Sequence, residues 1–300
     1  GMVPAATGTQ TAGSIVRPAS FCGVYAMKPS FGTIPRTGML KTTDSLDTVG
    51  FFTVYQRDLR RMFDAMRVHG KNYPISHAAL GDETRQHKGK QRPWRVGFAR
   101  THTWDYASKA AKDALERFIH TLATHQGVAV ADAPLPKIME KTHETHATIY
   151  DKSLSYYFQN EYAEADFLSP IMNELIERGA AITIEDFKIA IDLQTSMIYK
   201  MDAYFGDFDI LISLSTAGEA PARNKTELPD PALMWTLTHL PVVSAPVFTS
   251  ENGLPFGIQI VARKYNDYLL LEFLGYLESL GMIPARSMYA RERQGYQNKK

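Results

Sequence analysis

A strand–helix–strand order near the middle of the chain constrains its fold more than any other pattern. Trp94–Phe98 is a short apolar segment of the kind that forms a strand. From Ser108 to His125, apolar residues recur every three or four positions, which indicates an amphipathic helix. Gly127–Val130 then returns to a strand pattern. Strands that alternate with helices favour an α/β layer architecture.

Other elements are predicted on both sides of this unit. The first sixty residues, punctuated by glycine and proline, are expected to be strand, loop and turn, and the charged stretch at about 81–91 an exposed loop. From about 137 to 205 the chain is nearly free of proline and rich in helix formers. We expect residues 286–300 to be frayed. Helices are predicted at 58–66, 171–178, 187–204 and 267–280, and strands at 209–214 and 257–262.

Composition excludes several classes of partner. The 300 residues include 33 basic and 32 acidic side chains, so no excess charge attracts the chain to nucleic acid or to anionic lipid. The longest apolar runs are too short to span a membrane. Gly1 before Met2 resembles the scar of a removed tag, and no secretory signal pattern follows, so we expect a native start at Met2 and a cytoplasmic protein. The single cysteine, Cys22, cannot form an intrachain disulfide, and we expect it to be buried.

Residues 8–23 (GTQTAGSIVRPASFCG) carry the strongest functional signal. Small residues at Gly8, Ala12 and Gly13 let the backbone turn tightly and expose consecutive N–H groups. Ser14 would place its hydroxyl beside these donors, an arrangement that suits acyl transfer. By composition alone, such a run is more often an ordinary turn than a catalytic motif.

The wider match removes this ambiguity. The segment resembles the serine-containing motif of the amidase signature family, G-[ST]-[DQ]-T-G-G-S followed by an arginine, P-A and F-C-G. Similar blocks follow in the family's order at residues 24–32 (VYAMKPSFG), 45–50 (SLDTVG), 209–212 (DILI), 240–247 (LPVVSAPV) and 252–261 (NGLPFGIQIV). The resemblance therefore covers almost the whole chain.

The resemblance implies a fold and a reaction. The fold would be a mixed, twisted sheet covered by helices on both faces, in a single core spanning residues 2–300. A variable helical segment at about 137–205 would shape the substrate pocket. The reaction would be hydrolysis of a small-molecule amide through an acyl-enzyme, without metal or organic cofactor.

The resemblance also assigns roles to residues. Ser14 would be the nucleophile, and the backbone N–H groups of Thr11, Ala12, Gly13 and Ser14 would form the oxyanion hole. Each such donor lowers the barrier by about 3 kcal/mol. Three further residues would support the site: Gln10, Arg17 and Asp47. Asp47 is expected to order a loop behind the site rather than to transfer protons. Ala12 departs from the family's usual glycine, Gln10 from its frequent aspartate, and Arg17 lies three residues after the serine rather than two.

Two parts of the family's catalytic machinery have no counterpart in this sequence. A serine needs a neighbouring base, and the family uses a lysine acting through a second serine held in a cis peptide, both more than twenty residues before the nucleophile. This sequence begins thirteen residues before Ser14, and Lys28 and Lys41 lie on the wrong side of the motif. We therefore expect the chain as given to be inactive, either because the gene start is placed too late, the interpretation we favour, or because the protein is naturally short.

Other hypotheses remain open. The chain could be a catalytically dead ligand-binding or scaffold protein, or the amide-hydrolysing A-type subunit of an amidotransferase. Lack of the family's first part would leave apolar surface uncovered and promote self-association. His143 and His146, spaced i and i+3, could bind a metal, but with no third ligand we expect them to be exposed and unliganded.

Overall fold

The computed structural model describes residues 3–89 and 91–287, and these build one mixed sheet of eight strands. The strand order is β1-β3-β2-β7-β8-β6-β4-β5. β4 pairs in parallel with β5 and β6, and all other neighbours are antiparallel. The strands are β1 (Ala5–Gln10), β2 (Tyr25–Lys28), β3 (Thr48–Thr53), β4 (Trp94–Phe98), β5 (Val128–Asp132), β6 (Ile210–Leu214), β7 (Val242–Thr249) and β8 (Pro255–Ala262).

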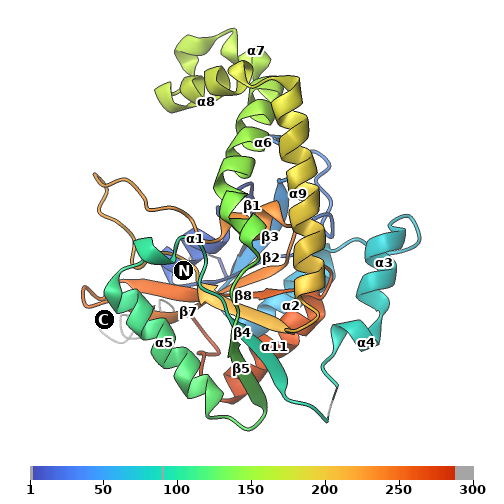
Figure 1. The fold of residues 1–300 in the computed structure, drawn as a ribbon, viewed down its shortest axis with the longest axis vertical. Helices are drawn as coiled ribbons and strands as arrows, with labels where there is room; N and C mark the ends of the chain where they lie inside the picture. The colour runs from blue at the N-terminus through green and yellow to red at the C-terminus, as the bar shows by residue number, and fades with distance from the viewer. Residues whose placement is uncertain (1–2, 90, 288–300) are drawn as a thin grey trace, which may run out of the picture.

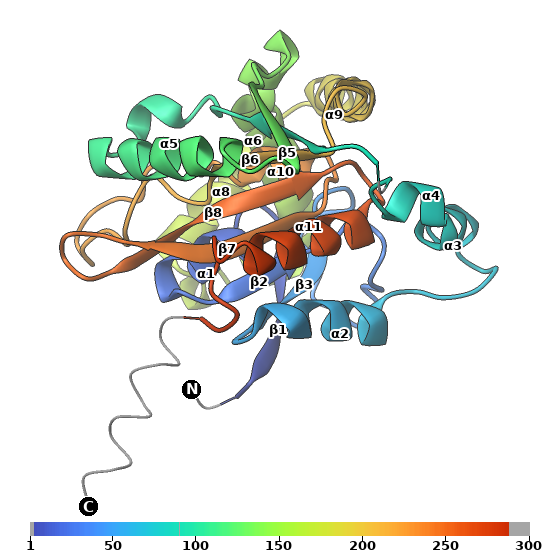
Figure 2. The same ribbon diagram turned by 90° about the horizontal axis from the view of Figure 1, so that it is seen from below.

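Helices cover both faces of this sheet (Figures 1 and 2). They are α1 (Val16–Cys22), α2 (Gln56–Met66), α3 (Pro74–Gly81), α4 (Glu83–Gln86), α5 (Lys109–Ala123), α6 (Thr142–Tyr157), α7 (Gln159–Tyr162), α8 (Pro170–Ala181), α9 (Ile184–Tyr204), α10 (Leu233–Leu237) and α11 (Asp267–Ser279). Short 3-10 turns occupy Trp104–Tyr106, Lys137–Lys141 and Ala165–Phe167. The predicted mixed sheet between two helical layers is confirmed.

The two faces have separate apolar cores because successive strand residues point to opposite sides. Ile210 and Ile212 of β6 pack in a cluster with residues of α2, α5 and α11. Leu211, between them, packs in a second cluster with residues of α1, α6, α9 and α10. The second layer is the one that carries the β1–α1 turn.

α6 and α9 extend away from the sheet, and α7 and α8 lie at their far end (Figure 1). α8 and α9 correspond to the helices predicted at 171–178 and 187–204. Each begins at a residue whose hydroxyl accepts a backbone N–H. Ser169 accepts from Met172 at 3.2 Å and Thr183 accepts from Asp186 at 3.0 Å. Such N-caps satisfy donors that the first helical turn leaves unpaired.

Four local predictions are wrong, the last of them in part. α1 forms within the region expected to be strand, loop and turn, and it ends at Gly23, whose φ of 64° is the left-handed conformation that glycine favours. α4 interrupts the loop expected at 81–91, with Asp82 accepting from the N–H groups of Thr84 and Arg85. Cys22 is exposed rather than buried, because it occupies the last turn of a short helix. The expected frayed end is not frayed at its first two residues, because Arg286 forms a β-bridge with Tyr55 and the N–H of Ser287 donates to Val54 O at 2.8 Å. Residues 288–300 lie outside the described part of the chain.

Among the helices of the described residues, none is long and apolar enough to cross a membrane.

Candidate active site

Ser14 lies in the turn between β1 and α1. It is exposed, whereas Gly13 and Ile15 on either side are buried. No hydrogen bond joins its hydroxyl to any residue that the structure describes. The side chain of Ser14 is therefore accessible to solvent, on a turn whose flanking residues are buried.

Gln10 joins the two ends of this turn. Its fully buried side chain accepts hydrogen bonds at Oε1 from the N–H groups of Ile15 at 2.7 Å and Val16 at 3.0 Å. Its Nε2 donates to Thr236 Oγ1 at 2.8 Å. The last residue of β1 thus satisfies the first donors of α1.

Three consecutive carbonyl groups of the turn have fixed partners. Thr11 O lies 2.8 Å from His146 Nε2, Ala12 O accepts from Thr236 Oγ1 at 2.6 Å, and Gly13 O accepts from the N–H of Arg17 at 2.9 Å. The N–H groups of residues 11–14 have no hydrogen-bond acceptor in the described part of the chain. An oxyanion hole is formed from such unpaired N–H donors beside a nucleophile.

His146 is 5% exposed, which contradicts the expectation that it would be exposed. Burial lowers its pKa to about 4, so the ring is neutral near pH 7. His143, also expected to be exposed, is half-buried and contacts His102. No group of three or more metal-ligating side chains occurs among the described residues. The prediction for His146 is wrong because this face of α6 packs against the β1–α1 turn instead of facing solvent.

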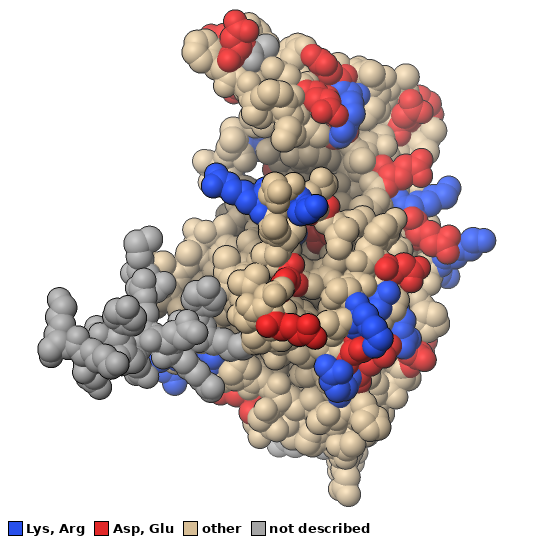
Figure 3. Space-filling model, turned by 90° about the vertical axis from the view of Figure 1, so that its left-hand side faces the viewer, with Lys and Arg blue, Asp and Glu red and all other residues tan. Residues whose placement is uncertain are grey.

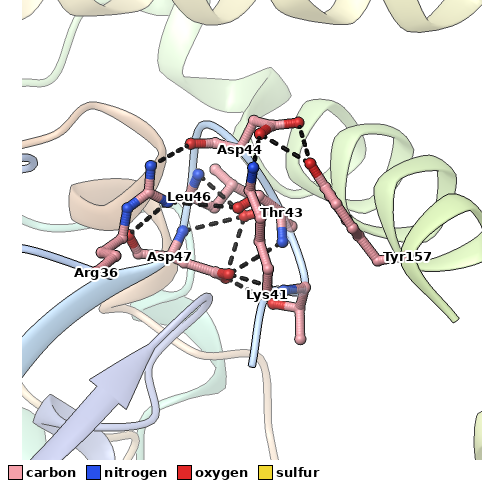
Figure 4. Close-up of polar contacts among 8 residues, drawn as sticks. Arg36, Lys41, Thr43, Asp44, Leu46, Asp47 and Tyr157 are labelled. Carbon is pink, nitrogen blue, oxygen red and sulfur yellow. Dashed lines mark hydrogen bonds and ion pairs between the residues drawn. The ribbon is translucent and has the colours of Figure 1, made fainter. Parts of the chain in front are cut away.

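Asp47 organises the loop of residues 36–47 behind the turn (Figure 4). It accepts from the N–H groups of Thr42 at 2.8 Å and Thr43 at 3.0 Å, and from Thr11 Oγ1 at 2.8 Å. Burial opposes ionisation, but these hydrogen bonds outweigh it and hold the pKa of the carboxyl below its usual range. Through Thr11, the loop is connected directly to the β1–α1 turn.

The same loop is joined to the helical segment. Tyr157 of α6 donates to the carboxylate of Asp44 at 2.8 and 2.9 Å, and Lys41 contacts that carboxylate as well (Figure 4).

Lys28 is fully buried and donates to Leu240 O at 2.5 Å, and burial lowers its pKa to about 7. Neither Lys28 nor Lys41 is hydrogen-bonded to Ser14.

Asp230 packs directly against the turn. A Cβ placed on Gly13 would lie 1.7 Å from Asp230 Oδ2, so only glycine fits there. Oδ1 accepts from the N–H of Ala232 at 2.8 Å, while Oδ2 has no hydrogen-bond partner among the described residues. Arg17 lies 3.7 Å from Oδ2 and 2.7 Å from Glu227. Burial raises the pKa of Asp230.

A cavity of about 380 Å³ opens beside this group. Arg17 and Phe21, one helical turn apart on α1, line one wall, and residues 216–222 and 227–231 line another. Figure 3 views the side on which the loop of residues 215–231 lies in Figure 1, and the surface is hollowed there. The volume of this cavity suits part of a small ligand.

Sequence reasoning missed three contributors to this site: His146 in its observed role, Asp230 and Thr236. They lie more than 130 residues from the turn, as the separations of 135 for His146 and 224 for Thr236 illustrate. Asp230-Pro231 has the form of an ordinary turn dipeptide, and a threonine in an apolar helix carries no signal of its own.

Known proteins resemble this chain in sequence and in fold. A family model described as Amidase matches residues 1–271. The A subunit of glutamyl-tRNA(Gln) amidotransferase from Rhodospirillum rubrum is 28% identical in an alignment covering 89% of this chain and 60% of that protein. The AtzE subunit of 1-carboxybiuret hydrolase from Pseudomonas sp. strain ADP is also 28% identical, over 94% of this chain and 64% of that protein.

Solved structures agree. A crystal structure of an amidase superposes with a TM-score of 0.77 at 23% identity, covering 92% of this chain and 62% of that one. A protein complex connected with the origins of an s-triazine catabolic enzyme gives a TM-score of 0.79 at 25% identity, covering 95% of this chain and 64% of that one. The chain thus spans 60 to 64% of the length of these relatives.

Proposed function

This chain belongs to the amidase signature family, and we propose that it carries the nucleophile and oxyanion hole of an amide hydrolase. The observation that supports this most directly is the β1–α1 turn. Its carbonyl groups are bonded into the protein while the N–H groups of residues 11–14 lack acceptors among the described residues, and Ser14 is exposed beside them. Unpaired N–H donors next to an exposed serine support this assignment, because acyl transfer needs donors that can bind the developing oxyanion.

The proposed reaction begins with attack of Ser14 Oγ on the carbonyl carbon of the amide. The hydroxyl proton passes to a base, and the carbonyl oxygen becomes an oxyanion held by the N–H groups. The C–N bond then breaks, and the amine leaves with a proton. Water hydrolyses the resulting ester, which releases the acid and restores the serine. The cavity beside Arg17 and Asp230 would receive part of the amide.

We propose that the 300-residue chain by itself does not perform this reaction. Among the described residues no group is hydrogen-bonded to Ser14 Oγ, so none is placed to take its proton. The family's lysine and cis-serine, supplied by sequence upstream of residue 1, would complete the site.

A fluorophosphonate probe tests both statements. Read by mass spectrometry of the peptide containing Ser14, the probe should label a chain extended upstream with the lysine and glycine-serine loop, but not the 300-residue chain. Ser14→Ala in the extended chain is the control and should abolish the signal. Labelling of the short chain would contradict its inactivity, and labelling elsewhere in the extended chain would contradict the assignment of Ser14.

A second candidate is an A-type amidotransferase subunit, because the relative from Rhodospirillum rubrum carries that description. Such a subunit would hydrolyse glutamine and pass ammonia to a partner. Ammonia release by the extended chain from glutamine, compared with simple aliphatic and aromatic amides, separates the two candidates. Preference for glutamine would favour the amidotransferase subunit. Binding of amides without any turnover or labelling would instead favour a catalytically dead binding protein.

A further inference from the structure

The direction of each N–H group in the β1–α1 turn is set by the carbonyl group before it. A peptide unit is planar and trans, so its C=O and N–H bonds point in opposite directions. Fixing the carbonyl of one residue therefore fixes the N–H of the next. In this turn, the carbonyl of Thr11 governs the N–H of Ala12, and the carbonyl of Ala12 governs the N–H of Gly13.

The two carbonyl groups are held by side chains from different parts of the fold. Thr236, in α10, donates to Ala12 O, and its Oγ1 also accepts from Gln10. His146, in α6, lies 2.8 Å from Thr11 O. Because a carbonyl oxygen only accepts, Nε2 of His146 must carry the proton. Each peptide plane thus has its own anchor.

His146 is itself well fixed. Its ring is 5% exposed and stacks on Tyr150, one turn later in α6, with centroids 5.8 Å apart and planes inclined by 20°. Its neutral state near pH 7 keeps a single N–H, and the observed contact directs that N–H to Thr11. A rigid donor from a rigid helix leaves the Thr11–Ala12 peptide plane little freedom to rotate.

We propose that His146 is a positioning residue of the oxyanion hole, which aims the N–H of Ala12 at the developing oxyanion by holding the carbonyl of Thr11. This rests on the proposed role of the turn. It gives α6, within the helical segment, a part in preorganising catalysis. Thr236 performs the same task for the N–H of Gly13.

The rigidity of individual N–H bonds tests the proposal without any turnover. It is measured as order parameters by ¹⁵N relaxation on the deuterated 300-residue chain. In the unchanged chain, the N–H order parameters of Ala12 and Gly13 should both be about 0.85, the value of rigid backbone. His146→Leu should lower the Ala12 value below about 0.6, typical of flexible backbone, and leave Gly13 little changed. Thr236→Val should do the reverse.

Conservative variants separate positioning from packing. Glutamine places its amide N–H where Nε2 lies in histidine, so His146→Gln should preserve the order of Ala12. Asparagine has a donor that is too short to reach Thr11, so His146→Asn should lose it. His120→Leu, at an exposed position of α5, is the control and should change neither value.

The proposal is overturned if His146→Leu or His146→Asn leaves Ala12 rigid, or if each variant loosens Ala12 and Gly13 equally, as general destabilisation would. If His146→Leu does not fold, the Gln and Asn variants decide between the same outcomes. The relaxation experiment measures no hydrolysis, so a negative result for His146 does not affect the fluorophosphonate test of Ser14. Likewise, absence of labelling at Ser14 does not affect the measured rigidity of the N–H bonds of Ala12 and Gly13.

Discussion

At the scale of single residues, the site depends on close approaches that no larger side chain permits. Gly13 is the tightest of these, because the carboxyl group of Asp230 occupies the space that a Cβ would take. Asp230 in turn is buried, and one of its oxygens lacks a hydrogen-bond partner among the described residues, which is a cost in stability. Such costs are common where residues serve function.

Gly13→Ala should destabilise the fold by about 1–3 kcal/mol, as overpacked buried sites do. Either Asp230 or the turn must move to admit the methyl group. Urea unfolding measures the change. Gly275→Ala, within α11 and with no atom within 4 Å of the added Cβ, is the matched control. It should stabilise the chain by about 0.5–1 kcal/mol, because alanine favours the helix. Equal effects of the two substitutions would contradict the close approach of Asp230.

Asp230→Asn should increase stability most at high pH. Burial raises the pKa of Asp230, opposed by Arg17 and the N–H of Ala232 and reinforced by Glu227. A carboxyl whose folded pKa is raised contributes its full stability below its unfolded pKa of about 3.9, and loses stability as pH rises toward the folded value. Asparagine removes this loss.

Urea unfolding of both proteins at several pH values from about 4 to 8 brackets the range in which a raised carboxyl pKa acts. The advantage of the variant should grow with pH and reach about 0.5–2 kcal/mol, the usual gain from a single stabilising substitution. Asp192→Asn, at an exposed position of α9, should show no such trend. A pH-independent difference for Asp230→Asn would contradict the raised pKa.

At the scale of elements, short helices and loops are held by capping and by long-range contacts rather than by propensity. α1 depends on Gln10 at its start and on Gly23 at its end. The correctly predicted helices α5 and α9 have apolar periodicity over several turns. The helices α1 and α4, which the sequence did not reveal, have too few turns for a period to appear.

Thr183→Ala should destabilise the chain by about 1 kcal/mol, because the hydroxyl accepts the N–H of Asp186 at the start of α9. Thr195→Ala is the matched control on the same helix, where the hydroxyl donates back to Ile191 O at 2.9 Å. Such mid-helix bonds add little stability. Thermal unfolding of both variants should separate them, and similar melting temperatures would contradict the cap.

At the scale of the whole molecule, the sheet ends in an edge strand. β1 pairs only with β3 among the described strands, and Ala6, Thr7 and Thr9 are exposed. An unpaired edge offers backbone donors and acceptors to another chain. The β1–α1 turn lies at the end of this same strand, so pairing of β1 with another chain would affect the turn that carries Ser14.

We expect the isolated chain to self-associate through β1. Light scattering after size-exclusion chromatography should give a mass above 33.7 kDa. Thr7→Lys should return the chain to a monomer, because a charge on an edge strand discourages pairing. Thr121→Lys, at an exposed position of α5, should leave the assembly unchanged. A monomer at all concentrations would contradict the expectation.

The α/β class, the family and the turn that carries Ser14 could be predicted from the sequence, because these depend on local periodicity and on residues adjacent in the chain. The groups that surround this turn could not. His146, Thr236 and Asp230 reach it from three distant segments, and side chains so far apart in sequence share no local pattern. Their placement follows from how the helices pack on the sheet, which fixes the carbonyl groups of the turn and, through the planar peptide, the direction of its N–H bonds.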